Sequence, residues 1–345
     1  MSTAASGLEL IADIGGTNAR FALTDPNAAE PGVLQPQSLL NAEFGSLQHA
    51  AEHYLASVGV RPRRAAMAVA SPVVADEIRL TNRAWSFSRK ELQEALQLDE
   101  LLMLNDFGAV AWAVPALGAN DCVALYGPAT RPLRGPITVL GPGTGLGVAQ
   151  LVGSDTDGWQ VVETEGGHVS FAPIGEEEQA IARWLTAQFG RASNERVLCG
   201  KGLSHIDAVL RGTGLATAEA STMPAAHSGA AAHPALRDPA DIVAAALQGH
   251  DLAARRTLAR FCAVLGSVAG DAALIHGART VLIAGGIVPR FVPFLRSSAF
   301  RERFLAKGRF AQYLESVAIQ TIAHPHPGML GAAVALRTAR SENSQ

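Results

Sequence analysis

The segment Leu8–Asp25, LELIADIGGTNARFALTD, limits the possible folds of this chain more than any other stretch. Two apolar runs, Leu8–Ile14 and Ala19–Leu23, lie on either side of Gly15-Gly16-Thr17. Short runs rich in Leu, Ile and Phe around a glycine pair predict two strands joined by a tight turn. The chain is therefore expected to begin with a β-hairpin.

The turn of this hairpin has the composition of a phosphate-binding loop. Glycines let backbone N–H groups approach a ligand closely, and a row of N–H groups next to the Thr17 hydroxyl suits phosphate oxygens. The Asp13 carboxylate at the start of the turn is a candidate ligand for hydrated Mg²⁺. Neither GxxxxGK[ST] nor a GxGxxG that opens a helix is present. The alternative is an ordinary hairpin in which Asp13 only caps the turn.

A second segment repeats the pattern. Ile137–Val152, ITVLGPGTGLGVAQLV, consists of an apolar run, the turn Gly143-Thr144-Gly145, and another apolar run. The two turns lie about 130 residues apart in the sequence. Together they predict a duplicated architecture in which two halves bind phosphates.

Composition narrows the class of protein. The 345 residues allow two domains, and 48% hydrophobic with 17% charged residues is typical of a globular chain. The net charge of −3 and the scattered Lys and Arg argue against nucleic acid as a partner. Cys122, Cys199 and Cys262 lie far apart, so we expect reduced thiols rather than a zinc site. The N-terminus lacks the pattern of a signal peptide, and the apolar stretch Phe261–Ile275 is too short to cross a membrane.

A strand–helix junction carries the next candidate site. In Leu101–Leu117, four apolar residues predict a buried strand, after which helical spacing begins at Phe107. Asn105 and Asp106 thus lie at the carboxyl end of a strand, where open α/β sheets bind ligands. The dipole of the following helix favours an ionised Asp106. The alternative is that one of the two residues only caps the helix.

Further polar candidates lie in the second half. Glu165 and His168 are placed around Gly166-Gly167 between two β-like runs, an arrangement suited to hydrogen bonding with clustered hydroxyl groups. A zinc site is a weaker interpretation, because no third ligand is apparent. The alternative is a surface turn in which the two polar residues are incidental. Glu195 follows the predicted helix cap Ser193. The acidic run Glu176–Glu178 is expected in the first turn of a helix, where the helix dipole favours carboxylates.

In the last third of the chain, the spacing of apolar residues predicts mostly buried helices over Asp241–Gly277 and then a strand that ends in Gly285-Gly286. This third glycine turn could let a flat ring lie against backbone, or be a plain tight turn. A final helix is expected from Met329 to about Arg340. The segment from 212 to 239 is rich in Ala, Gly and His and is expected to be an exposed, mobile loop.

These motifs, in this order, resemble the bacterial ATP-dependent glucokinases, in the hexokinase branch of the actin-like ATPase superfamily. The resemblance spans nearly the whole chain and is most specific in LNDF, EGGH and AGGIVPRF taken together. The other matching segments are ADIGGTNARFAL, SPVVADEIRLTNRAWSFS, GPGTGLGVAQL, SNERVLCGKGL and HPHPGMLGAA. The cysteine-rich zinc motif of the related branch of sugar kinases and repressors is absent, as is a helix-turn-helix region before the first hairpin.

The resemblance implies an α/β fold of two domains, ribonuclease H-like, with ATP and sugar in a cleft between them. The smaller domain would comprise residues 1–113 together with the final helix, 327–345, and the larger domain residues 114–326. These boundaries are expectations that follow from the family.

The resemblance also assigns roles. Asp106 is implied as the catalytic base, and Asn105, Glu165, His168 and Glu195 as the residues that bind the sugar hydroxyls. The nucleotide would contact three turns, whose residues are Ala12, Asp13, Ile14, Gly15, Gly16 and Thr17, then Gly143, Thr144 and Gly145, and finally Gly285 and Gly286. Asp13 would bind Mg²⁺ through water.

The expected reaction is transfer of the γ-phosphate of ATP to the 6-hydroxyl of D-glucose, in the cytoplasm, by a homodimer with no membrane or nucleic-acid partner. One alternative is a kinase of the same fold that acts on another hexose, such as fructose or mannose. Another is a sugar-sensing regulator that binds without phosphorylating. A nicotinamide dehydrogenase is disfavoured because its GxGxxG fingerprint is missing.

Overall fold

The structure is a computed structural model that describes residues 7–70, 77–79, 85–129, 132–212 and 236–342. The chain divides into two compact units. Unit 1 consists of Met1–Cys122, Ala149–Glu163 and Ala323–Gln345, and unit 2 of Val123–Val148 and Thr164–Ile322. Most of the predicted 212–239 loop lies outside the described residues.

A five-stranded sheet forms the centre of unit 1, with strand order β3-β2-β1-β4-β7. Up to Asp121 the elements are β1 (Glu9–Ile14), β2 (Asn18–Thr24), β3 (Leu34–Leu40), η2 (Asn41–Glu43), α1 (Leu47–Val58), β4 (Arg64–Val69), β5 (Glu77–Arg79), β6 (Ser86–Ser88), α2 (Arg89–Ala95), β7 (Glu100–Asn105), α3 (Asp106–Ala113), η3 (Val114–Ala116) and η4 (Ala119–Asp121). The chain returns to unit 1 in α13 (Pro327–Glu342).

The first predicted hairpin is confirmed. β1 and β2 are antiparallel, with Ile14 opposite Ala19, while β1, β4 and β7 are parallel neighbours. The carboxyl ends of β1 and β7 therefore lie at the same edge of the sheet. This edge carries the first glycine turn and the Asn105-Asp106 junction.

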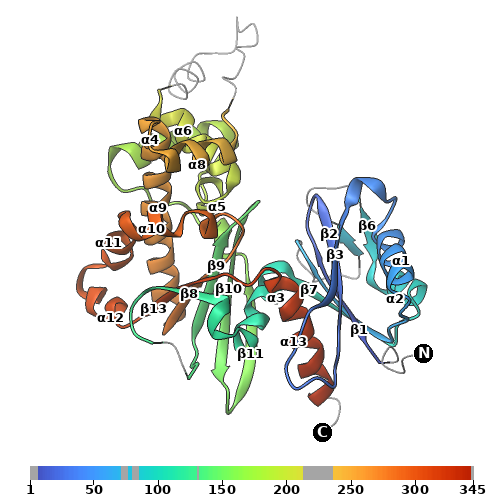
Figure 1. Cartoon of the computed structure of the whole chain (residues 1–345). Coiled ribbons are helices and arrows are strands. Elements are labelled where there is room, and N and C mark those ends of the chain that lie inside the picture. Colours follow the sequence, from blue (N-terminus) through green and yellow to red (C-terminus); the bar gives the residue numbers. More distant parts are fainter. Residues whose placement is uncertain (1–6, 71–76, 80–84, 130–131, 213–235, 343–345) are drawn as a thin grey trace, which may run out of the picture. The chain divides into compact units, whose positions relative to one another are not determined.

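Helices cover both faces of this sheet (Figure 1). Alternate residues of β1, such as Leu10 and Ile14, pack in one cluster with residues of α1 and α2, while Ile11 packs with α13 on the opposite face. α13 also lies directly on α3, because a Cβ added at Gly331 would meet the carbonyl oxygen of Ala109 at 1.6 Å. The last helix of the chain thus supports the helix that begins at Asp106.

A six-stranded sheet has the order β11-β10-β9-β12-β13-β8, with β9, β12 and β13 parallel. Its strands are β8 (Cys122–Tyr126), β9 (Ile137–Pro142), β10 (Leu146–Ser154), β11 (Gly158–Thr164), β12 (Thr280–Ile283) and β13 (Ala318–Ile322). The helices that follow Thr164 are η5 (Gly166–His168), α4 (Gly175–Phe189), α5 (Asn194–Val197), α6 (Gly200–Leu210), α8 (Pro239–Gln248), α9 (Leu252–His276), η6 (Val288–Phe291), α10 (Val292–Ser297), α11 (Phe300–Leu305), η7 (Gly308–Phe310) and α12 (Ala311–Glu315).

The structure differs from expectation after Glu165. The second β-like run is not a strand, because Gly166–His168 forms a 3-10 turn and only an isolated bridge pairs Ser170 with Ser193. The glycine pair permits this tighter turn. The predicted helices over Asp241–Gly277 and at the C-terminus are confirmed as α8, α9 and α13.

The helix α9 is longer than the apolar stretch Phe261–Ile275 predicted. Its 25 residues are long and apolar enough to cross a membrane, but 67% of its most apolar window is buried inside the protein. Alanines and arginines, which favour helix, extend it back to Leu252. α9 therefore has the burial of a core helix.

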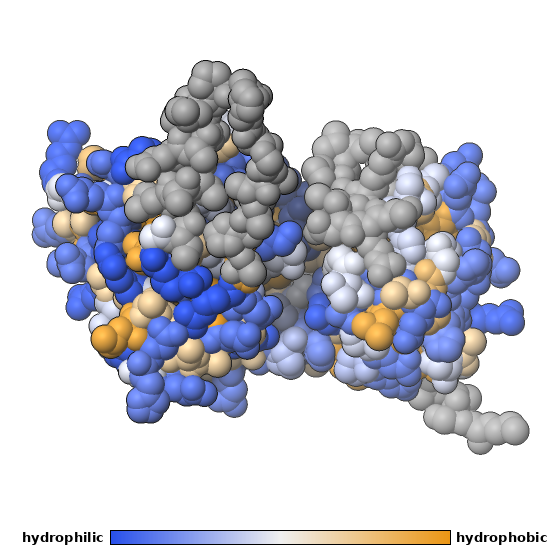
Figure 2. Space-filling view, turned by 90° about the horizontal axis from the view of Figure 1, so that it is seen from above, coloured by the Kyte–Doolittle hydropathy of each residue, from blue (hydrophilic) through white to orange (hydrophobic). Residues whose placement is uncertain are grey.

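On the face seen in Figure 2, hydrophobic side chains are scattered in small groups on a mainly hydrophilic surface.

The acidic run lies in the first turn of α4, as predicted, but Glu178 has a further role. Its side chain is fully buried and forms ion pairs with Arg303, at 2.8 Å, and with Arg260, at 2.9 Å. Burial raises the pKa of the Glu178 carboxyl, but hydrogen bonds from Arg303 and the Ile174 N–H outweigh it and lower the pKa below its ordinary value. The residue ties α4 to α9 and α11.

Candidate active site

The first glycine turn presents free backbone donors. The Gly15 N–H donates to the Asn18 carbonyl oxygen at 3.0 Å and closes the turn. Within the described part of the chain, neither the Gly16 nor the Thr17 N–H has a hydrogen-bond partner. Two adjacent unpaired N–H groups on a partly exposed turn can bind the oxygens of a phosphate.

Asp13 lies beside this turn and is paired with Arg20, whose guanidinium is 3.2 Å from the Asp13 carboxylate. Burial raises the pKa of the Asp13 carboxyl, against the opposing effects of Arg20 and of His326. A Cβ added at Gly328, at the start of α13, would lie 3.3 Å from the Asp13 Cγ, so the start of α13 passes close to this side chain. The described residues contain no cluster of three or more His, Cys, Asp or Glu side chains suited to a metal ion. One carboxylate fits Mg²⁺ that is held mainly by water and phosphates.

The second glycine turn, in unit 2, has the same property. The Gly143 N–H donates to the Gly145 carbonyl oxygen at 2.8 Å, and the N–H groups of Thr144 and Gly145 have no partner among the residues described. The Gly200 N–H, at the start of α6, donates to the Gly143 carbonyl oxygen at 2.9 Å. The turn is thereby fixed with its free N–H groups available to a phosphate.

The third glycine turn packs closely on the end of β9. Gly285 has a φ of +89°, and a Cβ there would lie 2.4 Å from the carbonyl oxygen of Pro142. Only glycine fits both conditions. Gly286 has open space around its Cα, which is compatible with a flat ring lying against the backbone.

Asn105 and Asp106 form the predicted junction between β7 and α3. The Asn105 Oδ1 accepts hydrogen bonds from the N–H groups of Phe107 and Gly108, so Asn105 is the helix cap. Asp106 is partly exposed, and its Oδ1 accepts the Phe107 N–H at 2.8 Å. Asn105 therefore caps α3 through its Oδ1, and its amide nitrogen has no hydrogen-bond partner among the residues described.

Sequence reasoning missed the contact of Glu163 with this junction. Its Oε1 accepts the Asn105 N–H at 3.0 Å, and a Cβ added at Gly108 would lie 2.4 Å from the same oxygen. Glu163 lies near the end of β11, two residues before Glu165. No local pattern marks it, since the contact joins residues 58 positions apart.

The three polar residues predicted in the second half lie together in unit 2. His168 is between two carboxylates, with its Nε2 3.8 Å from Glu165 and its Nδ1 3.9 Å from Glu195. The Glu195 Oε2 accepts the Leu146 N–H at 3.1 Å, directly after the second glycine turn. Half-exposed carboxylates and an imidazole at this spacing can bind several hydroxyl groups of one sugar.

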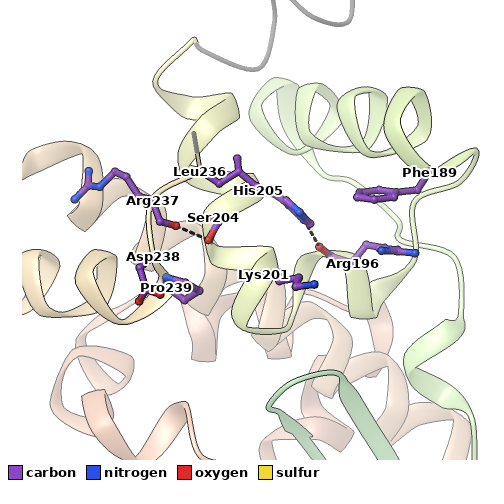
Figure 3. Close-up of a pocket in the computed structure, with 9 residues that line it drawn as sticks. All are labelled: Phe189, Arg196, Lys201, Ser204, His205, Leu236, Arg237, Asp238 and Pro239. Carbon is purple, nitrogen blue, oxygen red and sulfur yellow. Dashed lines mark hydrogen bonds between the residues drawn. The ribbon is translucent and has the colours of Figure 1, made fainter. Parts of the chain in front are cut away.

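A pocket of about 500 Å³ lies along α6 (Figure 3). His205 lines it, and the imidazole Nδ1 bonds to the carbonyl oxygen of Arg196 at 3.2 Å. The Arg196 guanidinium lies 4.0 Å from the centre of the Phe189 ring. Burial lowers the pKa of His205, so the imidazole is neutral near pH 7. Its lining carries the positive side chains of Arg196, Lys201 and Arg237 together with the carboxylate of Asp238.

Two α/β units, each with a glycine turn in which two N–H groups lack a partner among the described residues, and a carboxylate at the end of a strand are typical of the sugar kinases with an actin-like ATPase fold. The family model named Glucokinase matches residues 10–339. A glucokinase from Chromobacterium violaceum is 42% identical over 330 residues, which cover 95% of this chain and 88% of that protein. The chain belongs to the glucokinase family.

Solved structures agree. The crystal structure of a glucokinase from an Antarctic psychrotroph is 36% identical, with a TM-score of 0.79, over 96% of this chain and 99% of that chain. A more distant ROK-family glucokinase from Streptomyces griseus, solved in complex with glucose and AMPPNP, has 18% identity and a TM-score of 0.59, over 95% and 98% of the two chains. At that identity the likeness concerns the fold alone.

Proposed function

We propose that this protein transfers the γ-phosphate of ATP to the 6-hydroxyl of D-glucose, with Asp106 as the catalytic base. Membership of the glucokinase family supports the reaction. The observation that carries the residue assignment is the position of Asp106, partly exposed at the β7–α3 junction, on the same sheet edge as the first glycine turn. Phosphoryl transfer requires a base near a bound phosphate, and the position of Asp106 on the sheet edge that carries the first glycine turn supports this assignment.

In the proposed reaction, Asp106 accepts the proton of the sugar's primary hydroxyl while that oxygen attacks the γ-phosphorus in line. The bond between the γ-phosphorus and the bridging oxygen breaks, and ADP leaves. Glu165, His168 and Glu195 bind the sugar hydroxyls together with the Asn105 amide.

The free N–H groups of the first two glycine turns would bind phosphate oxygens and stabilise the charge that develops on them. The third turn, Gly285-Gly286, would contact the nucleoside end. A glucokinase of the ROK family was solved with AMPPNP, which supports ATP as the nucleotide. Mg²⁺ would be bound by the phosphates and, through water, by Asp13, and would neutralise phosphate charge.

Two alternatives differ in their observable behaviour. A kinase of the same fold for fructose or mannose would keep the mechanism and change the hydroxyl contacts. A regulator would bind sugar without turnover, but the partly exposed carboxylate of Asp106 at the strand–helix junction and the two glycine turns favour a kinase. We further propose a cytoplasmic location, where ATP is supplied and the three thiols stay reduced. The homodimer and the absence of membrane and nucleic-acid partners stay predictions.

The substitution Asp106→Asn tests the base assignment. The amide keeps the size of the side chain and cannot accept the proton, so kcat should fall by about 10² to 10⁴. The dissociation constant of glucose, measured by calorimetry, should change little. Near-normal turnover in this variant would refute the role of Asp106. Sugar binding without turnover in the unaltered protein would support the regulator instead.

A further inference from the structure

Asn41 is a buried polar residue outside every motif of the sequence. It follows β3 and begins η2, and its side chain is 0% exposed. β3 pairs with β2 in antiparallel register, with Leu40 opposite Asn18. This register places Asn41 next to Thr17, at the first glycine turn.

Two donors of Asn41, its backbone N–H and its side-chain amide, bind carbonyl oxygens of that turn. Its backbone N–H donates to the Thr17 carbonyl oxygen at 3.0 Å, and its Nδ2 donates to the Gly15 carbonyl oxygen at 2.8 Å. The C=O and N–H of a trans peptide unit point in opposite directions. Because Asn41 binds the Gly15 carbonyl, the Gly16 N–H of the same peptide is directed away from Asn41. That N–H is one of the free donors described above.

The same turn would be prone to reorientation without this contact. Glycine tolerates both signs of φ, so the Gly15-Gly16 peptide can rotate at low cost. A rotated peptide would present its carbonyl oxygen, instead of its N–H, to a phosphate, and two negative oxygens repel each other. A side-chain donor on the carbonyl is therefore what fixes the polarity of the turn.

The other half of the Asn41 amide carries an energetic cost. Its Oδ1 is buried and has no hydrogen-bond partner in the described part of the protein. A buried acceptor left unpaired destabilises a fold. The contribution of the Asn41 side chain therefore lies in the hydrogen bond that its Nδ2 donates to the Gly15 carbonyl oxygen.

We propose that Asn41 is a positioning residue for the nucleotide: it holds the Gly15-Gly16 peptide in the orientation in which the Gly16 N–H binds a phosphate of ATP. The inference rests on the proposed function, since it assigns the turn to the nucleotide. It predicts that loss of the Asn41 amide weakens the binding of ATP and leaves the binding of glucose unchanged.

The test compares Asn41→Leu with Tyr54→Phe. Leu has nearly the shape of Asn and lacks the donor, so the KM for ATP-Mg should rise roughly tenfold, as expected for one hydrogen bond, while the dissociation constant of glucose stays unchanged. Tyr54 is equally buried and donates its hydroxyl to the Gln35 carbonyl oxygen of β3 at 3.0 Å, away from the turn. Tyr54→Phe removes a similar bond and should leave the KM for ATP-Mg unchanged.

Asn41→Asp adds a second measurement. A carboxylate repels the Gly15 carbonyl and attracts the Gly16 N–H of the rotated peptide, so its KM for ATP-Mg should exceed that of Asn41→Leu. An unchanged KM in folded Asn41→Leu, an equal rise in Tyr54→Phe, or failure of both Asn41 variants to fold would overturn the inference. Absence of glucose phosphorylation in the unaltered protein would instead refute the proposed function.

Discussion

Glu195 contacts two parts of unit 2, the proposed sugar-binding cluster and the segment that follows the second glycine turn. One of its carboxylate oxygens lies 3.9 Å from His168 in the proposed sugar cluster, and the other accepts the Leu146 N–H after the second phosphate turn. Gly145 leaves room for it, because a Cβ at that position would lie 2.4 Å from the Glu195 Oε2. Glu165, by contrast, has His168 as its side-chain neighbour.

This difference predicts distinct kinetics for two alanine variants. Glu165→Ala should raise the KM for glucose by about 10- to 100-fold, because a charge-assisted hydrogen bond to the sugar is lost, and leave the KM for ATP unchanged. Glu195→Ala should raise both, since the second phosphate turn also loses its contact. Initial rates over a grid of glucose and ATP concentrations measure the two constants. The same pattern in both variants would contradict the assignment.

At the scale of the elements, the ion pairs of Glu178 determine how α4 is attached. Arg303 donates to both carboxylate oxygens, at 2.8 and 3.0 Å, and Arg260 donates to one of them. Glu176, two residues earlier in the same turn, is exposed. The pair offers a matched comparison of a buried and an exposed carboxylate.

We expect Glu178→Gln to lower the free energy of unfolding by about 3 to 5 kcal/mol, because the largely buried Arg303 loses its counter-charge and Arg260 keeps only Glu177. Glu176→Gln should change it by less than about 0.5 kcal/mol. The folded-state pKa of Glu178 lies below the ordinary value of 4.5, so its stabilisation is complete above pH 4.5 and is lost as the pH falls further. Urea unfolding at pH 7 and pH 4 measures this. If the free energy of unfolding that Glu178→Gln loses is as large at pH 4 as at pH 7, this explanation is contradicted.

The same scale shows what the sequence could predict. The glycine hairpins, the Ser193 cap and the strand–helix junction at Asp106 follow from local patterns, and the structure contains all of them. Glu178 was predicted in its helix turn, but its buried partners lie more than 80 residues away. Local patterns give the element, and long-range packing decides the environment of the side chain.

At the scale of the whole molecule, two contacts that matter for the proposed site join segments that lie far apart in the sequence. α13 returns to pack on α3, and Glu163 contacts the Asn105 N–H from β11. Neither contact has a sequence signature, because both join distant segments. Asn41 belongs to the same group, since its position depends on the register between β2 and β3. The resemblance to glucokinases predicts the site residues, and the structure adds the residues that contact them.

The central claim is that this chain phosphorylates glucose from ATP. The most direct measurement is kcat/KM for sugar 6-phosphate formation with ATP-Mg and, in turn, glucose, fructose, mannose and N-acetylglucosamine. The account predicts turnover with a strong preference for glucose. Equal or better turnover with another hexose would contradict the assignment of the sugar. No turnover with any sugar, despite measurable glucose binding, would contradict the account as a whole.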